Sequence, residues 1–219
     1  MGACSTYISM YGSQAAVSVL YQAYFGNARI SGLMSAISYL PMFIFMPFIA
    51  KIVRKYGKKE AASFGCMFSL LACVLMIVLP ITPDGKGMAI YVACQVLNGL
   101  GMGVYTCISY SMFADAIDYN EWKFGVRDEG TLYAIHSFFR KFAQGVFPSI
   151  GLMIAAWLGY VAVLGPAQTD AVSLRMRYMV AVMYLLASIV QFCGIKFVYN
   201  LDKKTVGTMT EELNARAKE

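Results

Sequence analysis

Five polar or charged side chains lie in or next to a strongly apolar stretch, SFFRKFAQGVFPSIGLMIAAW, residues 137–157. They are His136, Ser137, Arg140, Lys141 and Gln144. His136, Arg140 and Gln144 are spaced four residues apart, so a helix places them on one face. Such a face can line an aqueous cavity, and its cations can attract an anionic group. We do not expect an enzyme, because the single histidine has neither a metal-ligand cluster nor a nucleophile at usable spacing.

The composition indicates a membrane protein. Of the 219 residues, 59% are hydrophobic and 14% are charged, and the mean hydropathy is +0.59. A soluble domain of this length has about one half apolar and one quarter charged residues. The apolar residues form long runs between short polar segments, so we expect an all-α polytopic protein within a lipid bilayer. The net charge of +6 is not gathered into a basic patch with stacking aromatics, so nucleic acid is not an expected partner.

Six apolar runs are long enough to cross the hydrocarbon core as helices, which takes about 20 residues. They cover residues 3–25, 30–53, 61–81, 88–116, 130–163 and 175–199. We therefore predict six transmembrane helices forming one bundle over residues 1–200 and a cytoplasmic C-terminal tail over residues 201–219. The tail is expected to be solvated and to form a short amphipathic helix capped by Thr210.

The distribution of Lys and Arg predicts that both termini are cytoplasmic. With six spans, the N-terminus, the KIVRKYGKK region, the fourth loop and the tail share one side of the membrane. Twelve of the 18 basic residues lie on that side and four lie on the other. The side that is richer in Lys and Arg is cytoplasmic by the positive-inside rule.

Two further spans carry polar stripes. Their members are Gln95, Asn98, Thr106 and Ser109 on the fourth span, and Ser5, Ser9 and Ser13 on the first. Gly99, Gly101 and Gly103 thin the fourth span and let a neighbouring helix approach closely. Two interpretations of the fourth-span stripe stay open: it lines a cavity shared with the fifth span, or it bonds neighbouring helices.

The two adjacent cations of the fifth span also admit different interpretations. Arg140 lies about 11 residues, roughly 16 Å along a helix, from Glu129. It either snorkels to the cytoplasmic interface or pairs with Asp115 or Glu129, or it faces the cavity. Lys141 is one residue deeper and points about 100° around the helix, so we expect it in the cavity.

The segment ADAIDYNEWKFGVRDEG, residues 114–130, resembles the loop between the tenth and eleventh helices of the glycoside–pentoside–hexuronide:cation symporters. This family of the major facilitator superfamily includes melibiose permease. The resemblance continues through LYAIHSFFRKFAQG, residues 132–145, and covers the RKYGKK and FVYNLDKK stretches. It implies half of a twelve-helix major facilitator fold, namely the C-terminal six-helix half, in a bacterial-type inner (plasma) membrane. The partner would be an N-terminal six-helix half, encoded by the same gene or supplied by another chain.

The resemblance also implies secondary active transport of a sugar or glycoside, such as a pentoside or hexuronide, coupled to Na⁺ or H⁺. Lys141 occupies the place of a lysine that is important near the sugar and cation sites of melibiose permease. The other positions that align with sugar-lining residues are Thr106, His136, Ser137 and Arg140. Thr106 stands where the family has an aromatic sugar platform, so the resemblance does not predict which sugar is carried.

No cofactor or resident metal is expected, and the resemblance places the binding site of the co-transported cation in the missing N-terminal half. All 12 acidic residues of this chain lie in a loop, the tail or a span end, with Asp115 the deepest. Two interpretations of the charged loop stay open. Its charges are simply solvated, or they form a latch, that is, charged pairs between the two halves that stabilise the outward-facing state. The resemblance favours the latch. The residues assigned to this coupling or gating loop are Asp115, Asp118, Glu121, Arg127 and Glu129.

An alternative function stays open. The first residues, MGACSTYISM, enter the first span at once, without the linker expected before a seventh helix. This start predicts either an internal methionine or a split gene. The alternative to a transporter is a non-transporting truncated product or a structural subunit that requires a partner half.

Overall fold

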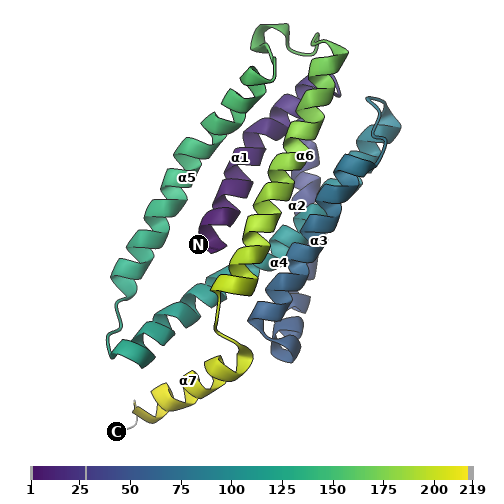
Figure 1. Ribbon diagram of the computed structural model, residues 1–219. Coiled ribbons are helices and arrows are strands. Elements are labelled where there is room, and N and C mark those ends of the chain that lie inside the picture. Colours follow the sequence, from purple (N-terminus) through teal and green to yellow (C-terminus); the bar gives the residue numbers. More distant parts are fainter. Residues whose placement is uncertain (1, 28, 217–219) are drawn as a thin grey trace.

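A computed structural model describes residues 2–27 and 29–216, with the side chains of residues 2–10, 14 and 39 outside the description. The described chain consists of helices joined by short turns, without a strand (Figure 1). The long helices are α1 (Gly2–Ala23), α2 (Arg29–Tyr56), α3 (Lys58–Val78), α4 (Gly85–Phe124), α5 (Glu129–Trp157) and α6 (Asp170–Cys193). Short elements are η1 (Ala162–Leu164), η2 (Gly194–Val198) and the C-terminal α7 (Lys203–Arg216). The all-helical prediction is confirmed.

Four helical segments are long and apolar enough to span a bilayer: α2, α3, α4 and α6 continued through η2. Each of the six predicted spans contains a long helix, although α5 ends at Trp157, six residues before the predicted end of the fifth span. Within the described residues, α1 and α5 are not among the helices that are long and apolar enough to span a bilayer. In α5 the reason is the group of polar side chains between His136 and Gln144, which lowers the hydropathy of the helix. The count of six membrane spans therefore stays a prediction.

The helices pack as a bundle in which α1 lies against α5 and α6, and α4 lies against α2 and α3. The turns α2–α3 and α4–α5 and the helix α7 lie together at one end, called the lower end below (Figure 1). Close approach of the helices depends on glycine, as predicted. A Cβ atom on Gly101 would collide with the backbone of α3 at Gly65, and one on Gly99 would collide with the Ser38 carbonyl of α2.

At the opposite end, Arg177 of α6 is buried and holds the C-terminus of α3. Its guanidinium donates to the carbonyl oxygens of Met76 (3.2 Å), Leu79 (2.5 Å) and Ile81 (3.3 Å). The last carbonyls of a helix lack partners within the helix and attract a cation. Arg177 falls within the predicted sixth span, 175–199, and α6, which begins at Asp170, places its side chain inside the bundle.

Two helices at the lower end extend beyond the elements that the sequence predicts. The fourth membrane span is predicted to end at residue 116, and α4 continues as a helix to Phe124, so the point where the chain leaves the bilayer stays a prediction. The helix ends at Phe124 because Gly125 adopts φ 70°, a left-handed conformation that glycine adopts readily, and its N–H bonds to the Glu121 carbonyl.

The tail is also helical from Lys203, seven residues earlier than the predicted cap at Thr210. It is not simply solvated, because Met209 is buried and the Trp122 Nε1–H of α4 donates to Glu212 at 2.7 Å.

Candidate functional site

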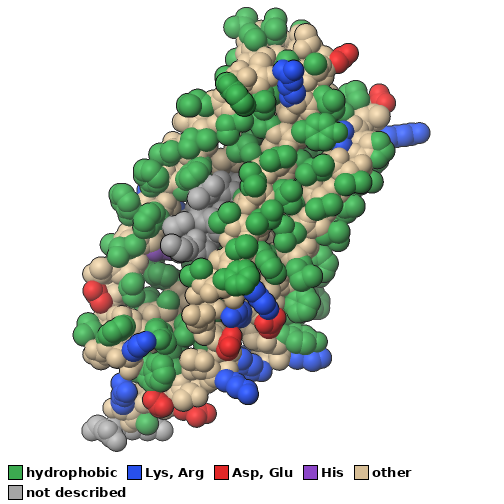
Figure 2. Space-filling model, viewed as in Figure 1, with side chains coloured by type: hydrophobic (Ala, Val, Ile, Leu, Met, Phe, Trp, Pro, Cys, Tyr) green, Lys and Arg blue, Asp and Glu red, His purple; other side chains and the backbone are tan. Residues whose placement is uncertain are grey.

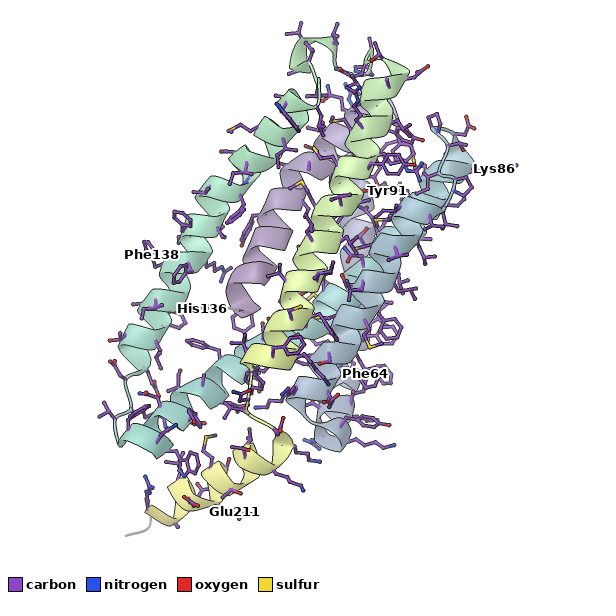
Figure 3. All side chains as sticks on the ribbon, viewed as in Figure 1. Phe64, Lys86, Tyr91, His136, Phe138 and Glu211 are labelled. Carbon is purple, nitrogen blue, oxygen red and sulfur yellow. The ribbon has the colours of Figure 1, made fainter. Side chains whose placement is uncertain are left out.

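The fifth helix has two distinct faces. Figure 3 shows His136 on the side of α5 that faces the bundle and Phe138 on the outer side. The His136 ring is half-buried, with its centroid 4.8 Å from that of Phe113 and 6.5 Å from that of Tyr110. On the outer side, Phe138 is 64% exposed. The predicted polar face of α5 therefore meets an aromatic segment of α4.

The structure separates the two adjacent cations of α5. Arg140 is half-buried, and its Nη1 lies 3.5 Å from the Tyr110 hydroxyl of α4. Lys141 is exposed, and within the described part of the chain it makes neither a hydrogen bond nor an ion pair. Arg140 therefore contributes to contact between helices, whereas Lys141 presents its charge outside this bundle.

The carboxylates considered as partners of Arg140 are engaged elsewhere. Asp115 accepts from Lys58, and Glu129 accepts from Arg127 at 2.5 Å. Arg140 instead contacts Tyr110, which lies one helical turn beyond Thr106 and was not singled out in the sequence. That spacing of four residues from a candidate site residue is the signal that could have identified it.

The remaining predicted members of the site are polar but differ in their bonding. The Thr106 hydroxyl donates to the Met102 carbonyl of its own helix at 2.7 Å. Ser137 is half-buried on α5. Gln144 donates to the Tyr11 hydroxyl of α1 at 2.6 Å, so the lower and middle parts of α5 are tied to two different helices.

Part of the fourth-span stripe bonds neighbouring helices rather than lining the site. Gln95 is buried and accepts from the hydroxyls of Tyr21 (3.3 Å) and Ser38 (3.4 Å). Asn98 is buried and accepts from Ser69, which in turn contacts Ser188 of α6 at 2.8 Å. These residues join α1, α2, α3, α4 and α6, whereas the Thr106 and Ser109 hydroxyls donate to carbonyl oxygens of their own helix. On the first span, Ser13 is buried, and the side chains of Ser5 and Ser9 lie outside the described residues.

The predicted gating loop is largely helical, and its charges gather on one arginine. Arg127 Nη1 lies 2.7 Å from Glu121 and 3.5 Å from Asp118, and its Nε lies 2.5 Å from Glu129. The hydrogen bonds to Glu129 and Glu121 raise the pKa of Arg127, which stays charged. Three carboxylates thus share one guanidinium, and the group keeps a net negative charge.

This cluster is fixed by the turn between two helices. Asp118 and Glu121 lie in the last turns of α4, and Glu129 is the first residue of α5. The Asp128 side chain accepts from the Thr131 N–H at 3.1 Å and caps α5. Figure 2 shows basic and acidic side chains gathered at the lower end of the molecule.

Asp115 lies in α4, apart from the cluster around Arg127, and its part in coupling or gating stays a prediction. It is a buried residue of α4, 6% exposed, and the Lys58 Nζ of α3 donates to both its carboxylate oxygens, at 2.6 and 2.7 Å. The Tyr199 hydroxyl donates to the same carboxylate at 3.3 Å. Asp115 therefore joins α3, α4 and the segment after η2.

Comparison with known proteins gives a consistent set of relatives. The family model described as MFS/sugar transport protein matches residues 1–203. The "Uncharacterized symporter YjmB" of Bacillus subtilis (strain 168) is 27% identical over 96% of this chain and 44% of its own length. The "Putative 2,3-dihydroxypropane-1-sulfonate exporter" of Escherichia coli (strain K12) is 30% identical over 92% of this chain and 42% of its own length.

The name of a third relative states a different solute. The "Isoprimeverose transporter" of Lactiplantibacillus pentosus is 31% identical over 54% of this chain and 24% of its own length. The chain thus spans less than half the length of these relatives, whose names include both an anionic and an uncharged solute.

Proposed function

Because this chain belongs to the MFS/sugar transport protein family, a family of multi-pass membrane transporters and not of enzymes, we propose that it is the C-terminal six-helix half of a secondary transporter. The complete transporter carries a sugar or glycoside together with Na⁺ or H⁺. The proposed substrate class is supported by the family description and by the name of one relative, the isoprimeverose transporter. The C-terminal assignment rests on the resemblance of residues 114–130 to the loop between the tenth and eleventh family helices.

The observation that carries the proposal is the exposed ammonium of Lys141 on a helix otherwise rich in apolar side chains. A cation at membrane depth is costly unless a carboxylate, a bound anion or water stabilises it. The described residues supply Lys141 with no carboxylate. A second six-helix half would supply the carboxylates across a central cavity, and the cation and sugar would compete for them as the halves rock. In this proposal His136, Ser137, Arg140 and Thr106 line this half of the cavity, and His136 and Arg140 lie there beside Tyr110 of α4.

The membrane orientation follows from the same proposal. The lower end carries the basic α2–α3 turn, Arg127 and the basic start of α7. The positive-inside rule makes this end cytoplasmic, with both termini on that side of a bacterial-type inner membrane.

Two measurements test the proposed function. Sequencing the source DNA upstream of codon 1 is expected to reveal six further apolar spans in frame or in an adjacent gene. Proteoliposomes with both halves are expected to accumulate isoprimeverose or 2,3-dihydroxypropane-1-sulfonate when a Na⁺ or H⁺ gradient is imposed. Uptake should stop when an ionophore removes the gradient. Uptake no greater than in empty liposomes for both solutes, under both gradients, would contradict transport of this class.

The cluster around Arg127 supports a second part of the proposal, a cytoplasmic latch. Asp118, Glu121 and Glu129 carry three negative charges against one positive charge, so the cluster can attract cations of the partner half. Such pairs would stabilise the outward-facing state and break when the cytoplasmic side opens. Sugar selectivity would not depend on them, because the latch lies at the end of the bundle.

Charge reversal at Arg127 is expected to open the cytoplasmic side less often. Arg127→Glu places a fourth carboxylate in the cluster, which then attracts the cations of the partner half more strongly. Exposed pairs contribute about 0.2–1 kcal/mol each, so labelling of a Ser137→Cys probe from the cytoplasmic side should slow by about three-fold. Lys123→Glu makes the same charge change on α4, but its ammonium contacts Tyr119 rather than these carboxylates. Equal labelling rates in both variants and in the parent would exclude the latch.

A further inference from the structure

The outer face of α2 carries an apolar stripe that ends in two cations. Leu40, Ile44 and Phe48 follow each other at four-residue spacing and are 56%, 64% and 53% exposed. Lys51 and Lys55 continue this stripe over the last two turns of the helix and are also exposed. A side chain pattern of this kind places apolar groups against acyl chains and charges at the level of lipid head groups.

The acidic side chains around the α2–α3 turn are paired with other cations. Glu60 pairs with Lys196 at 3.7 Å, Asp202 pairs with Lys59 at 3.4 Å, and Asp115 pairs with Lys58. Among the residues described by the structure, none forms an ion pair with Lys51 or Lys55. The ammonium of Lys55 lies 5.2 Å from the ring centre of Tyr56. Both cations therefore remain available to an anion from outside the bundle.

The end of α2 is held in place by the C-terminal segment. Lys203 Nζ donates to the carbonyl oxygens of Arg54 at 2.9 Å and Lys55 at 3.4 Å. These are the last carbonyls of α2, which a cation at the C-terminus stabilises. Because Lys203 fills this role, the side chains of Lys51 and Lys55 are not drawn back to their own helix end. The two ammonium groups are thus presented from a fixed turn.

We propose that Lys51 and Lys55 bind the phosphate head group of an anionic phospholipid, whose acyl chains lie along Leu40, Ile44 and Phe48. Charge complementarity selects this occupant, because two adjacent cations favour a lipid with net negative charge over a zwitterionic one. The attraction of basic side chains to an anionic membrane surface adds for each residue. Exposed Tyr56, at the same level as Lys55, is typical of the aromatic side chains that lie at the membrane–water interface.

Native mass spectrometry of the purified protein, with phosphatidylglycerol added in detergent, tests this site. Lys51→Gln/Lys55→Gln is expected to weaken the apparent affinity for the tightest-bound phosphatidylglycerol by about 30-fold, from the roughly additive contribution of two cations. Phosphatidylcholine is expected to bind the parent and the variant equally. Lys123→Gln/Lys204→Gln removes the same charge from the lower end and is expected to retain the parental affinity.

A second variant separates lost charge from damaged folding. Lys51→Arg/Lys55→Arg keeps both charges and is expected to bind phosphatidylglycerol within about three-fold of the parent. Equal weakening in the Lys123/Lys204 control would overturn the proposal, because binding would then follow net charge alone. The proposal would also be overturned if Lys51→Gln/Lys55→Gln bound phosphatidylglycerol with the parental affinity. That result is expected if a partner half, and not lipid, covers the stripe. Displacement of the lipid by glycerol phosphate at equal concentration would instead assign the cations to a soluble anion.

Discussion

Lys141→Leu is expected to reduce the initial rate of sugar uptake by about 30-fold or more while the bundle stays folded. The loss follows because a carboxylate of the partner half would be left without its cation in a cavity of low polarity, which costs about 2–5 kcal/mol. Folding is expected to persist because Lys141 is exposed and makes no polar contact within the described part of this chain. The measurement is uptake of labelled substrate into proteoliposomes, normalised to the amount of transporter in the membrane.

Two controls make this result specific to the position. Lys141→Arg keeps the charge and is expected to retain part of the activity, since arginine differs from lysine in shape and hydrogen bonding. Lys86→Leu removes an exposed cation at the upper end of the bundle and should transport at the parental rate (Figure 3). If Lys141→Leu also transports at the parental rate, Lys141 does not face the transport pathway.

The neighbouring cation is expected to behave differently. Arg140 is half-buried and lies 3.5 Å from the Tyr110 hydroxyl, so its removal disturbs the packing of α5 against α4 as well as the cavity. A loss of transport in an Arg140 variant can therefore come from a disturbed contact with α4 or from a changed cavity. The loss expected for a Lys141 variant comes from the cavity alone. This difference makes Lys141 the more informative of two residues that the sequence places side by side.

The positions of the helices could be predicted from hydropathy, but some of their ends could not. Hydropathy reports where a chain can enter lipid, whereas the hydrogen bonds of a helix continue into polar sequence. The segment from Asp118 to Phe124 is too polar to suggest a membrane span, yet it continues α4 to the left-handed Gly125. The residues of the proposed latch therefore lie largely on a helix, with a fixed geometry that a loop would lack.

The polar residues of α4 illustrate a second limit of the sequence. Gln95 and Asn98 share a stripe with Thr106, and helical spacing alone does not separate a cavity face from a packing face. The separation comes from partners distant in sequence, such as Tyr21 for Gln95 and Ser69 for Asn98. For the same reason the sequence alone groups Asp115 with its charged neighbours in the chain, although Lys58, the cation that it pairs with, is 57 residues away.

Asp115→Ala is expected to destabilise the folded protein by about 3 kcal/mol, within the range found when one partner of a buried ion pair is removed. The Lys58 side chain is 26% exposed, and its ammonium would lose both carboxylate oxygens and keep only a 3.5 Å contact with the Ser111 carbonyl. The Tyr199 hydroxyl would lose its acceptor as well. Thermal unfolding in detergent, followed by circular dichroism, measures the expected fall in the unfolding midpoint.

Replacing both Lys58 and Asp115 tests whether charge or shape holds α3, α4 and the chain after η2 together. Lys58→Met/Asp115→Leu removes both charges and fills the space with apolar atoms, so we expect it to recover most of the stability lost in Asp115→Ala. Asp202→Ala breaks the exposed pair with Lys59 and should cost less than about 1 kcal/mol. If Asp115→Ala unfolds no earlier than Asp202→Ala, the ion pair does not hold the helices together. A conformational role for Asp115, such as making and breaking its contact with Lys58 during transport, would then become the better explanation for a buried carboxylate at the lower end of α4.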